Sequence, residues 1–600
     1  MEGLLYGAAY YDEYMPYERM EEDLRLMKAA GMNTIRIAES TWSTWEPREG
    51  EFDFSKLHHM LREAKKAGIR VIVGTPTYAI PPWMVRVVPD ILADTHTGRC
   101  LYGHRQNMDL LHPKYRYYCE RMIRKLLEVT STYDNVIGYQ LDNETKPYDT
   151  CSSYAQEAFV QYLKEKFESL EEVNQEFGLS YWSNEVWDWK DFPDVRGSIN
   201  GSLSAEYKRF LRKVVTDFHA WQRSIVEEYR RENQFITHNF DYEWRNYSHG
   251  MQPEVDQYED GKNFTVIGAD LYHPSEDELT GAEIAFGGSL MYSLKRENYL
   301  ILETQAQGQF GWTPYPGQLL LCAYSHLAQG ANSVMYWHWH SIHNAMESYW
   351  KGVLSHDLTP GRIYEEAACL GKELARIGES LVNLKKSYGV AILVSHESLV
   401  GLDEFPLDAM EEEHPLNYND ILRWIYDGFY DLNVECTFVD ATLEKGEDLS
   451  DYALVVIPAL YSVTEEMIGK LRKYVEGGGH LFSTFRSFMA DDCLKIFHDP
   501  LPHGMTDVFG LTYDEFTKPS KEGIPKVSHY LELLRATTGS TIASYEHPFW
   551  KDYAMVVENH YGMGETTYLG AYVEEEVLHN LLRRVCEQAG ISLPKLKPQV

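Results

Sequence analysis

Short apolar runs alternate with amphipathic segments along the first 345 residues of the chain. Between the runs, apolar residues recur at helical spacing, as Met20, Leu24 and Met27 do, and Leu57 and Leu61. Strands that are apolar on both faces and separated by helices are typical of a closed parallel barrel, so we predict a TIM (β/α)8 barrel. The predicted strands are residues 4–9, 33–39, 70–76, 136–144, 235–240, 266–273, 299–305 and 333–340.

The pattern changes near residue 386. Strand-like runs then alternate with helix-like segments as far as about residue 485, which predicts a second, open α/β sheet. The last stretch holds three strand-like runs and one helix-like segment. We therefore expect a barrel over residues 1–385, an α/β domain over 386–530 and a small C-terminal β domain over 531–600. Residues 148–201 are predicted to form a long insertion in the barrel.

Composition and charge exclude several partners. Asp and Glu total 91 against 56 Lys and Arg, a formal net charge of -35 at pH 7. This charge repels nucleic acid and anionic membrane surfaces, and no apolar run is long enough to span a bilayer, so we expect neither partner. The N-terminus lacks a basic segment followed by a long apolar stretch, so we expect a cytoplasmic protein. The 8 cysteines include no C-x-x-C pair, which argues against a disulfide framework and a thiolate zinc site.

Two glutamates end predicted strands: Glu144 the fourth and Glu303 the seventh. In a parallel barrel both ends lie at one mouth, so the two carboxyl groups can face one another. Glycoside hydrolysis needs such a pair, because one carboxylic acid protonates the leaving oxygen while one carboxylate attacks or stabilises the anomeric carbon. A gap of about 5 to 5.5 Å implies retention and one of about 6.5 to 9.5 Å inversion, and the residues alone leave both open. The amide of Asn143 could hold the sugar 2-hydroxyl.

Seven short motifs occur in order along the chain, at residues 42–54, 74–77, 81–83, 142–144, 303–312, 330–332 and 352–357. Together they closely resemble family 42 of the glycoside hydrolases, the bacterial β-galactosidases. The resemblance covers nearly the whole chain. It implies hydrolysis of terminal non-reducing β-D-galactosyl residues of a galactoside or oligosaccharide, with retention and without a cofactor.

The resemblance also assigns roles to residues. Glu144 would be the acid/base and Glu303 the nucleophile. Arg105 would bind sugar hydroxyls, Tyr272 would lie near the nucleophile, and Trp312 would stack on the sugar ring. We expect the surroundings of Glu144 to raise its pKa in the free enzyme. The second domain would be an amidotransferase-like module that makes the contacts of a homotrimer. It would be noncatalytic, because the strand over residues 452–460 runs into Leu460-Tyr461, with no cysteine where an active amidotransferase needs its nucleophile.

Two departures from the family pattern matter. Many members have Glu-x-x-His after the eighth strand, whereas this chain has Glu347-Ser-Tyr-Trp350. An indole in place of an imidazole removes an acceptor and adds bulk, so we keep Glu347 as a sugar contact and expect Trp350 to change how galactose is bound. Some members carry a four-cysteine zinc cluster beside the acid/base loop. Only Cys151 lies in that region here, so we predict no structural zinc.

Three alternatives remain open. His338 and His340 alternate along one predicted strand in a way that resembles a metal site, but a polar sugar pocket explains them equally well, and we expect no metal. Trp350 could favour α-L-arabinopyranosides or β-D-fucosides, which alter or lack the C5 hydroxymethyl group. The chain could also be a noncatalytic sugar-binding protein, although binding alone needs no pair of carboxyl groups.

Overall fold

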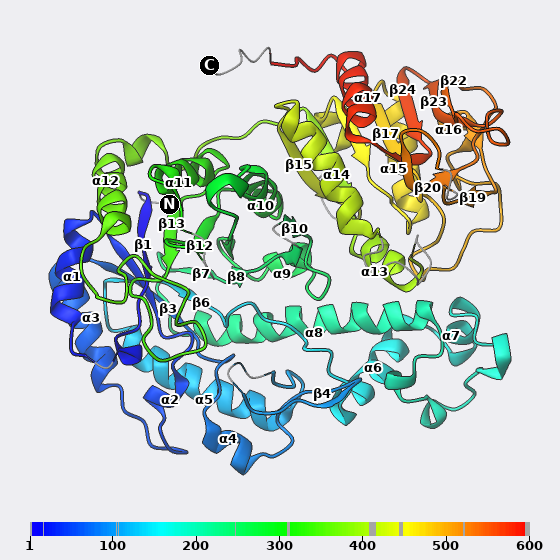
Figure 1. Cartoon of the computed structure of the whole chain (residues 1–600). Coiled ribbons are helices and arrows are strands. Elements are labelled where there is room, and N and C mark those ends of the chain that lie inside the picture. The colour runs from blue at the N-terminus through cyan, green and yellow to red at the C-terminus, as the bar shows by residue number, and fades with distance from the viewer. Residues whose placement is uncertain are drawn as a thin grey trace. The chain divides into compact units, whose positions relative to one another are not determined.

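Eight parallel strands close into the predicted barrel (Figure 1). The structure is a computed structural model that describes residues 3–15, 17–103, 105, 107–245, 248–308, 313–406, 416–442, 448–519 and 523–594. The hydrogen-bonded order is β7-β6-β3-β2-β1-β13-β12-β11-β8, and β7 and β8 are two halves of the fifth strand, so the sheet closes on itself. The strands are β1 (Leu5–Ala9), β2 (Thr34–Ile37), β3 (Arg70–Gly74), β6 (Val136–Gln140), β7 (Phe235–Thr237), β8 (Asn239–Phe240), β11 (Gly268–Asp270), β12 (Leu300–Gln305) and β13 (Ser333–Trp337).

Helices surround this barrel as the apolar spacing predicts. In α3 the buried residues are Leu57, Met60, Leu61 and Ala64, which recur at helical spacing on one face. The helix ends where Gly68 adopts φ 69°, a left-handed conformation that glycine reaches without a steric cost. The principal helices are α1 (Met20–Ala29), α3 (Ser55–Ala67), α5 (Pro113–Thr130), α8 (Gly201–Glu227), α10 (Ala282–Ser293), α11 (Gln318–Ala328) and α12 (Arg362–Ile377), with the short α9 (Gln257–Gly261) before β11.

The barrel interior is apolar at one end and polar at the other. Leu5, Ile72, Leu300, Leu302 and Met335 form a buried apolar cluster inside it. Beyond them, toward the carboxyl ends of the strands, polar side chains such as Arg36, Gln140, Asn239 and Glu303 are also buried. Buried polar groups require partners, so this polar end is where a site with fixed geometry is expected.

The chain divides into two compact units, one of residues 1–159 and 210–386 and one of residues 160–209 and 387–600. The second unit contains the predicted α/β sheet, in the order β15-β14-β16-β17-β24-β23-β22. Its parallel strands are β14 (Val390–Val394), β15 (Cys436–Asp440), β16 (Leu454–Ile457), β17 (His480–Thr484) and β24 (Gly564–Leu569), and β23 (Ala554–Tyr561) and β22 (Ser540–Ser544) add an antiparallel edge.

The β-rich C-terminal region is present as predicted. Three of its strands, β22, β23 and β24, extend the sheet of the α/β domain, and β19 (Phe516–Thr517), β20 (Val527–Glu532) and β25 (Ala571–Val573) form a small separate sheet. The predicted insertion contains α6 (Ser153–Lys166) and α7 (Leu170–Glu176) and leads into α8. Residues 160–209, which include most of the predicted insertion, group with the second unit. The domain boundaries at 385 and 530 stay predictions.

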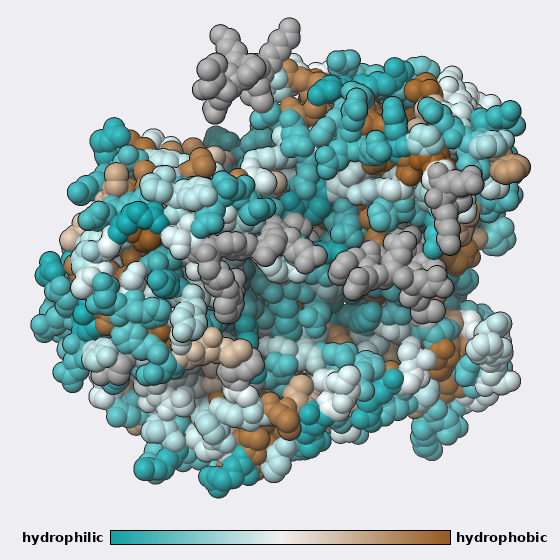
Figure 2. All heavy atoms as spheres, in the orientation of Figure 1, coloured by the Kyte–Doolittle hydropathy of each residue, from teal (hydrophilic) through white to brown (hydrophobic). Residues whose placement is uncertain are grey.

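Hydrophilic residues predominate on the face shown in Figure 2, where apolar residues occur in small scattered groups. Among the described residues, no helix combines the length and the apolar character needed to cross a membrane.

Candidate active site

A cleft of about 340 Å³ lies at the carboxyl ends of the barrel strands. Such a volume is in the range of small-ligand sites. The structure brings together seven of the eight predicted site residues in its lining: Arg105, Asn143, Glu144, Tyr272, Glu303, Glu347 and Trp350. The eighth, Trp312, lies outside the described residues.

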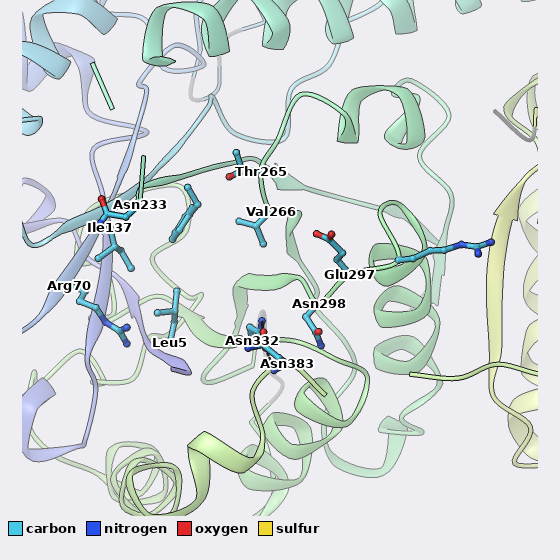
Figure 3. A pocket seen from close by; sticks show the side chains of 12 residues that line it. Leu5, Arg70, Ile137, Asn233, Thr265, Val266, Glu297, Asn298, Asn332 and Asn383 are labelled. Carbon is cyan, nitrogen blue, oxygen red and sulfur yellow. Dashed lines mark hydrogen bonds between the residues drawn. The ribbon is translucent and has the colours of Figure 1, made fainter. Parts of the chain in front are cut away.

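A larger cavity, of about 690 Å³, lies at the opposite end of the barrel (Figure 3). Leu5 and Arg70, at the starts of β1 and β3, are part of its lining. Among the described residues that line it, Glu297 is the one acid, so it offers no pair of facing carboxyl groups. In barrels of this kind the chemistry is found at the other end, where the predicted residues gather.

Glu144 follows β6 in a tight segment of the chain. Its backbone has φ 46° and that of Asp142 has φ 50°, which are uncommon conformations for residues other than glycine. The carboxylate accepts a hydrogen bond from Arg105, whose Nη1 lies 2.7 Å from Oε2. The Lys146 ammonium is close as well, 3.4 Å from the backbone oxygen of Glu144. Glu144 is therefore held beside two positive charges.

Glu303 lies on β12 and is almost fully buried. One carboxylate oxygen pairs with the Arg36 guanidinium. The other accepts a hydrogen bond of 2.6 Å from the Tyr272 hydroxyl. With both oxygens engaged, the carboxylate has a fixed orientation toward the cleft.

The two glutamates face one another across a short gap. One carboxylate oxygen from each of Glu144, Asp270 and Glu303 lies within 4.8 Å of the others. Oxygens this close favour the class of about 5 to 5.5 Å between carboxyl groups over the 6.5 to 9.5 Å that leaves room for an attacking water.

The pKa of Glu144 is shifted in the direction opposite to our expectation. Burial raises the pKa of Glu144, but Arg105 and Lys146 lower it by more, to about 2. For Glu303, burial raises the pKa to about 7 against the effect of Arg36, and the charge of Glu144 adds to the rise. The expected rise for Glu144 is thus wrong for the ligand-free site, because Arg105 forms an ion pair with it. Burial and then Glu144 raise the pKa of Asp270 well above its usual range.

Comparison with known proteins now decides the family. The family model described as beta-galactosidase matches residues 9–377, and a second, described as beta-galactosidase trimerisation domain, matches residues 389–592. The chain belongs to family 42 of the glycoside hydrolases. The family model spans the barrel that carries both glutamates, and the second model spans the α/β sheet and the β-rich region after it.

Relatives of this family 42 chain are similar over nearly its whole length. It is 27% identical to the beta-galactosidase LacZ of Lactobacillus acidophilus over 98% of this chain and 89% of that protein. It is also 27% identical to the beta-galactosidase BgaA of Clostridium cellulovorans, over 99% and 90% of the two chains. The solved structure of Gan42B, a beta-galactosidase from G. stearothermophilus, superposes with a TM-score of 0.92 at 24% identity, over 100% of this chain and 89% of that one.

Asn143 is poised to donate to a ligand. Its Oδ1 accepts hydrogen bonds from Gln140 Nε2 at 3.0 Å, from Asn239 Nδ2 at 3.2 Å and from Arg36 at 3.5 Å. Its amide nitrogen has no protein partner among the described residues. Since the side chain lines the cleft, the N–H groups of this amide are available to a sugar hydroxyl.

Trp350 and Glu347 form one wall of the cleft. The Trp350 ring packs edge-on against Tyr272, with ring centroids 4.7 Å apart. Its indole nitrogen is buried and makes no hydrogen bond within the described part of the chain. Glu347 accepts a hydrogen bond of 3.1 Å from the Trp337 indole. Many members of family 42 have an imidazole at the position of Trp350. This chain has an indole instead, packed against Tyr272, which donates a hydrogen bond to Glu303.

Sequence reasoning missed Arg36. This arginine lies on β2, is fully buried, and contacts Glu303, Asn143 and Gln140. A signal was present, because a charged residue in the middle of the apolar run 33–39 must find buried partners. Asp270, at the end of β11, has a carboxylate oxygen within 4.8 Å of an oxygen of each glutamate.

The two strand histidines do not converge on a common point. β13 ends at Trp337, so His338 and His340 lie beyond it and the predicted strand to residue 340 is too long. His338 contacts the backbone oxygen of Trp350, at 3.1 Å, and His340 contacts Asp23, at 3.2 Å. Both rings thus have protein partners of their own.

Cys151 lies near the acid/base segment. Its thiol is 3.3 Å from Nδ1 of His96, which pairs with Asp149 at 2.8 Å. These three donors come close together, with one thiol in place of the four that some members of family 42 use. The absence of a structural zinc stays a prediction.

Proposed function

We propose that this chain is a retaining exo-β-galactosidase that releases terminal non-reducing β-D-galactosyl residues. The single observation that carries the proposal is the pair of glutamates at the ends of separate strands, Glu303 buried and Glu144 partly buried, which have oxygens within 4.8 Å of one another in one cleft. Family membership supports the substrate class, and the volume of the cleft suits a single sugar ring.

The proposed reaction has two steps. In the first, a Glu303 oxygen attacks the anomeric carbon while Glu144 gives its proton to the leaving oxygen, so the glycosidic bond breaks and a glycosyl ester forms. In the second, Glu144 takes a proton from water, and the resulting nucleophile attacks the same carbon and releases Glu303. Arg36 and Tyr272 hold Glu303 in place, and two inversions leave the β configuration unchanged.

Arg105 sets the protonation of Glu144. While the ion pair persists, Glu144 is a carboxylate and cannot protonate a leaving group. A sugar hydroxyl that draws Arg105 away removes the main opposing charge, so burial then raises the pKa of Glu144. The proton that Glu303 binds in the free enzyme moves to Glu144 only when a substrate is bound.

The pH dependence of kcat/KM should follow from this cluster. The reaction needs one proton shared by Glu144 and Glu303. Glu303, with its pKa raised to about 7, binds that proton in the free enzyme below pH 7 and loses it as the pH rises. We expect kcat/KM for a nitrophenyl galactoside to fall about tenfold per pH unit above about pH 7. A kcat/KM that stays level or rises from pH 7 to pH 9 contradicts this expectation.

A second candidate function shares the chemistry. The Trp350 wall could disfavour the C5 hydroxymethyl group, so the substrates would be α-L-arabinopyranosides or β-D-fucosides. The third alternative is a sugar-binding protein without turnover. The two carboxylates that face one another in the cleft argue against it, because binding alone does not need such a pair.

A panel of nitrophenyl glycosides separates these candidates. We expect kcat/KM for the β-D-galactoside to exceed that for the β-D-fucoside and the α-L-arabinopyranoside. Higher values for either of those two would favour the second candidate, and tight galactose binding without turnover of any glycoside would favour the third. In the Trp350→His variant, a gain on the galactoside relative to the fucoside would show that the indole opposes the hydroxymethyl group.

We also propose that the chain is a homotrimer. The support is the match of residues 389–592 to the trimerisation domain of family 42. Light scattering that gives the mass of one or two 69.6 kDa chains would contradict it.

A further inference from the structure

The backbone around Glu144 is held in an unfavourable conformation. Asp142 and Glu144 both have positive φ, which side-chain-bearing residues adopt only where the surrounding structure compensates for the steric cost. The conformation determines where the Glu144 carboxyl points. The contacts that fix this segment therefore bear on the orientation of the acid/base.

Asp142 is the anchor of the segment. Its backbone N–H donates to Thr75 Oγ1 at 2.7 Å, and its backbone oxygen accepts from Gln140 Nε2 at 2.8 Å. Its carboxylate accepts a hydrogen bond from Thr77, at 2.5 Å, on one oxygen and from Thr145 on the other. Thr145 directly follows Glu144 in the sequence, so these contacts bracket the acid/base on both sides.

A buried chain of polar groups continues from Thr145. Its Oγ1 lies 2.9 Å from Nε2 of His219 on α8, and Nδ1 of His219 lies 2.8 Å from Asp260 on α9. These contacts form one continuous line of polar atoms: the Thr145 hydroxyl donates to Asp142, and the two ring nitrogens of His219 lie at hydrogen-bond distance from Thr145 and Asp260.

The order carboxylate, imidazole, hydroxyl also occurs in enzymes with a serine or threonine nucleophile. Here it cannot act in that way, because Thr145 is 1% exposed, His219 and Asp260 are 0% exposed, and none of them lines the cleft. These three side chains can affect a bound substrate only through the backbone of Glu144.

We propose that the Asp260–His219–Thr145 chain is a positioning device, which holds Asp142 and the left-handed backbone at Glu144 so that the acid/base carboxyl faces the leaving oxygen. The proposal rests on the proposed role of Glu144. Thr145, His219 and Asp260 are positioning residues, and the step they govern is proton transfer to the leaving group.

A matched pair of variants tests this role. Thr145→Val keeps the shape of the side chain and removes the hydroxyl, whereas Thr145→Ser keeps the hydroxyl. The readout is kcat/KM, which reports the first step, for two galactosides: methyl β-galactoside, whose leaving group needs a proton, and 2,4-dinitrophenyl β-galactoside, whose leaving group does not.

For Thr145→Val we expect kcat/KM to fall about 100-fold on the methyl galactoside and less than about threefold on the dinitrophenyl galactoside. Thr145→Ser should stay within about threefold of the parent on both. His219→Gln should show the same selective loss as Thr145→Val. Thermal unfolding identifies variants that are folded at the assay temperature, and only these are compared.

Two results overturn the proposal. One is an equal loss on both substrates in a folded Thr145→Val protein, which indicates a general structural role. The other is full activity of that protein on the methyl galactoside. Glu144→Ala is measured alongside: if it too lacks the selective loss, the assigned role of Glu144 fails, whereas if only the Thr145 and His219 variants lack it, the positioning proposal alone fails.

Discussion

Replacing Glu303 with Gln should abolish turnover of nitrophenyl β-galactoside, with kcat/KM reduced by about 10⁴-fold or more. The amide cannot form the glycosyl ester, and it loses the negative charge that stabilises positive charge at the anomeric carbon. The variant retains the shape of the side chain and can still accept a hydrogen bond from Arg36 or Tyr272, so we expect the protein to fold.

Glu297→Gln is the matched control for this variant. Glu297 lies in the same unit, in the cavity at the opposite end of the barrel. Its replacement by Gln should leave kcat/KM within about twofold of the parent value. Azide should restore turnover of an activated galactoside by Glu303→Ala and give α-galactosyl azide, because the anion attacks from the side that the carboxylate has vacated. Near-normal activity of Glu303→Gln would remove this residue from the mechanism.

Replacing Glu144 with Ala should produce a loss that depends on the leaving group. We expect kcat/KM to fall about 10² to 10⁴-fold for methyl β-galactoside, since a general acid typically contributes that much. For the dinitrophenyl galactoside the glycosyl ester should form at close to the parent rate, and its hydrolysis should become slow because no base activates the water.

Azide also distinguishes the acid/base from the nucleophile. In Glu144→Ala it should attack the glycosyl ester and give β-galactosyl azide, the opposite anomer to that from the Glu303 variant. Formation of the α anomer would exchange the roles of the two glutamates. This exchange needs to be tested, because the pKa is lowered at Glu144 and raised at Glu303, the reverse of the order that the assigned roles require.

The sequence predicts the barrel and the main pair of carboxyl groups because both follow from local pattern. Each predicted barrel strand overlaps an observed one, and counting strands places Glu144 and Glu303 at the same mouth because the carboxyl ends of parallel strands meet there. The second sheet follows in the same way from its apolar runs.

Properties that depend on distant side chains could not be predicted. The lowered pKa of Glu144 comes from Arg105, which is 39 residues away in the chain, and no local pattern gives that distance. The same holds for Arg36, which reaches Glu303 across 267 residues. The His219 and Asp260 pair was also missed, because each residue alone looks like an ordinary polar residue on a helix.

The most direct test of the central claim is time-resolved proton NMR of β-galactoside hydrolysis by the parent protein. The short gap between Glu144 and Glu303 predicts that the first galactose signal to appear is that of the β anomer, with the α anomer growing later by mutarotation. Initial α-galactose would mean inversion, and the absence of any released galactose would mean a sugar-binding protein. Either result would contradict the proposed double displacement.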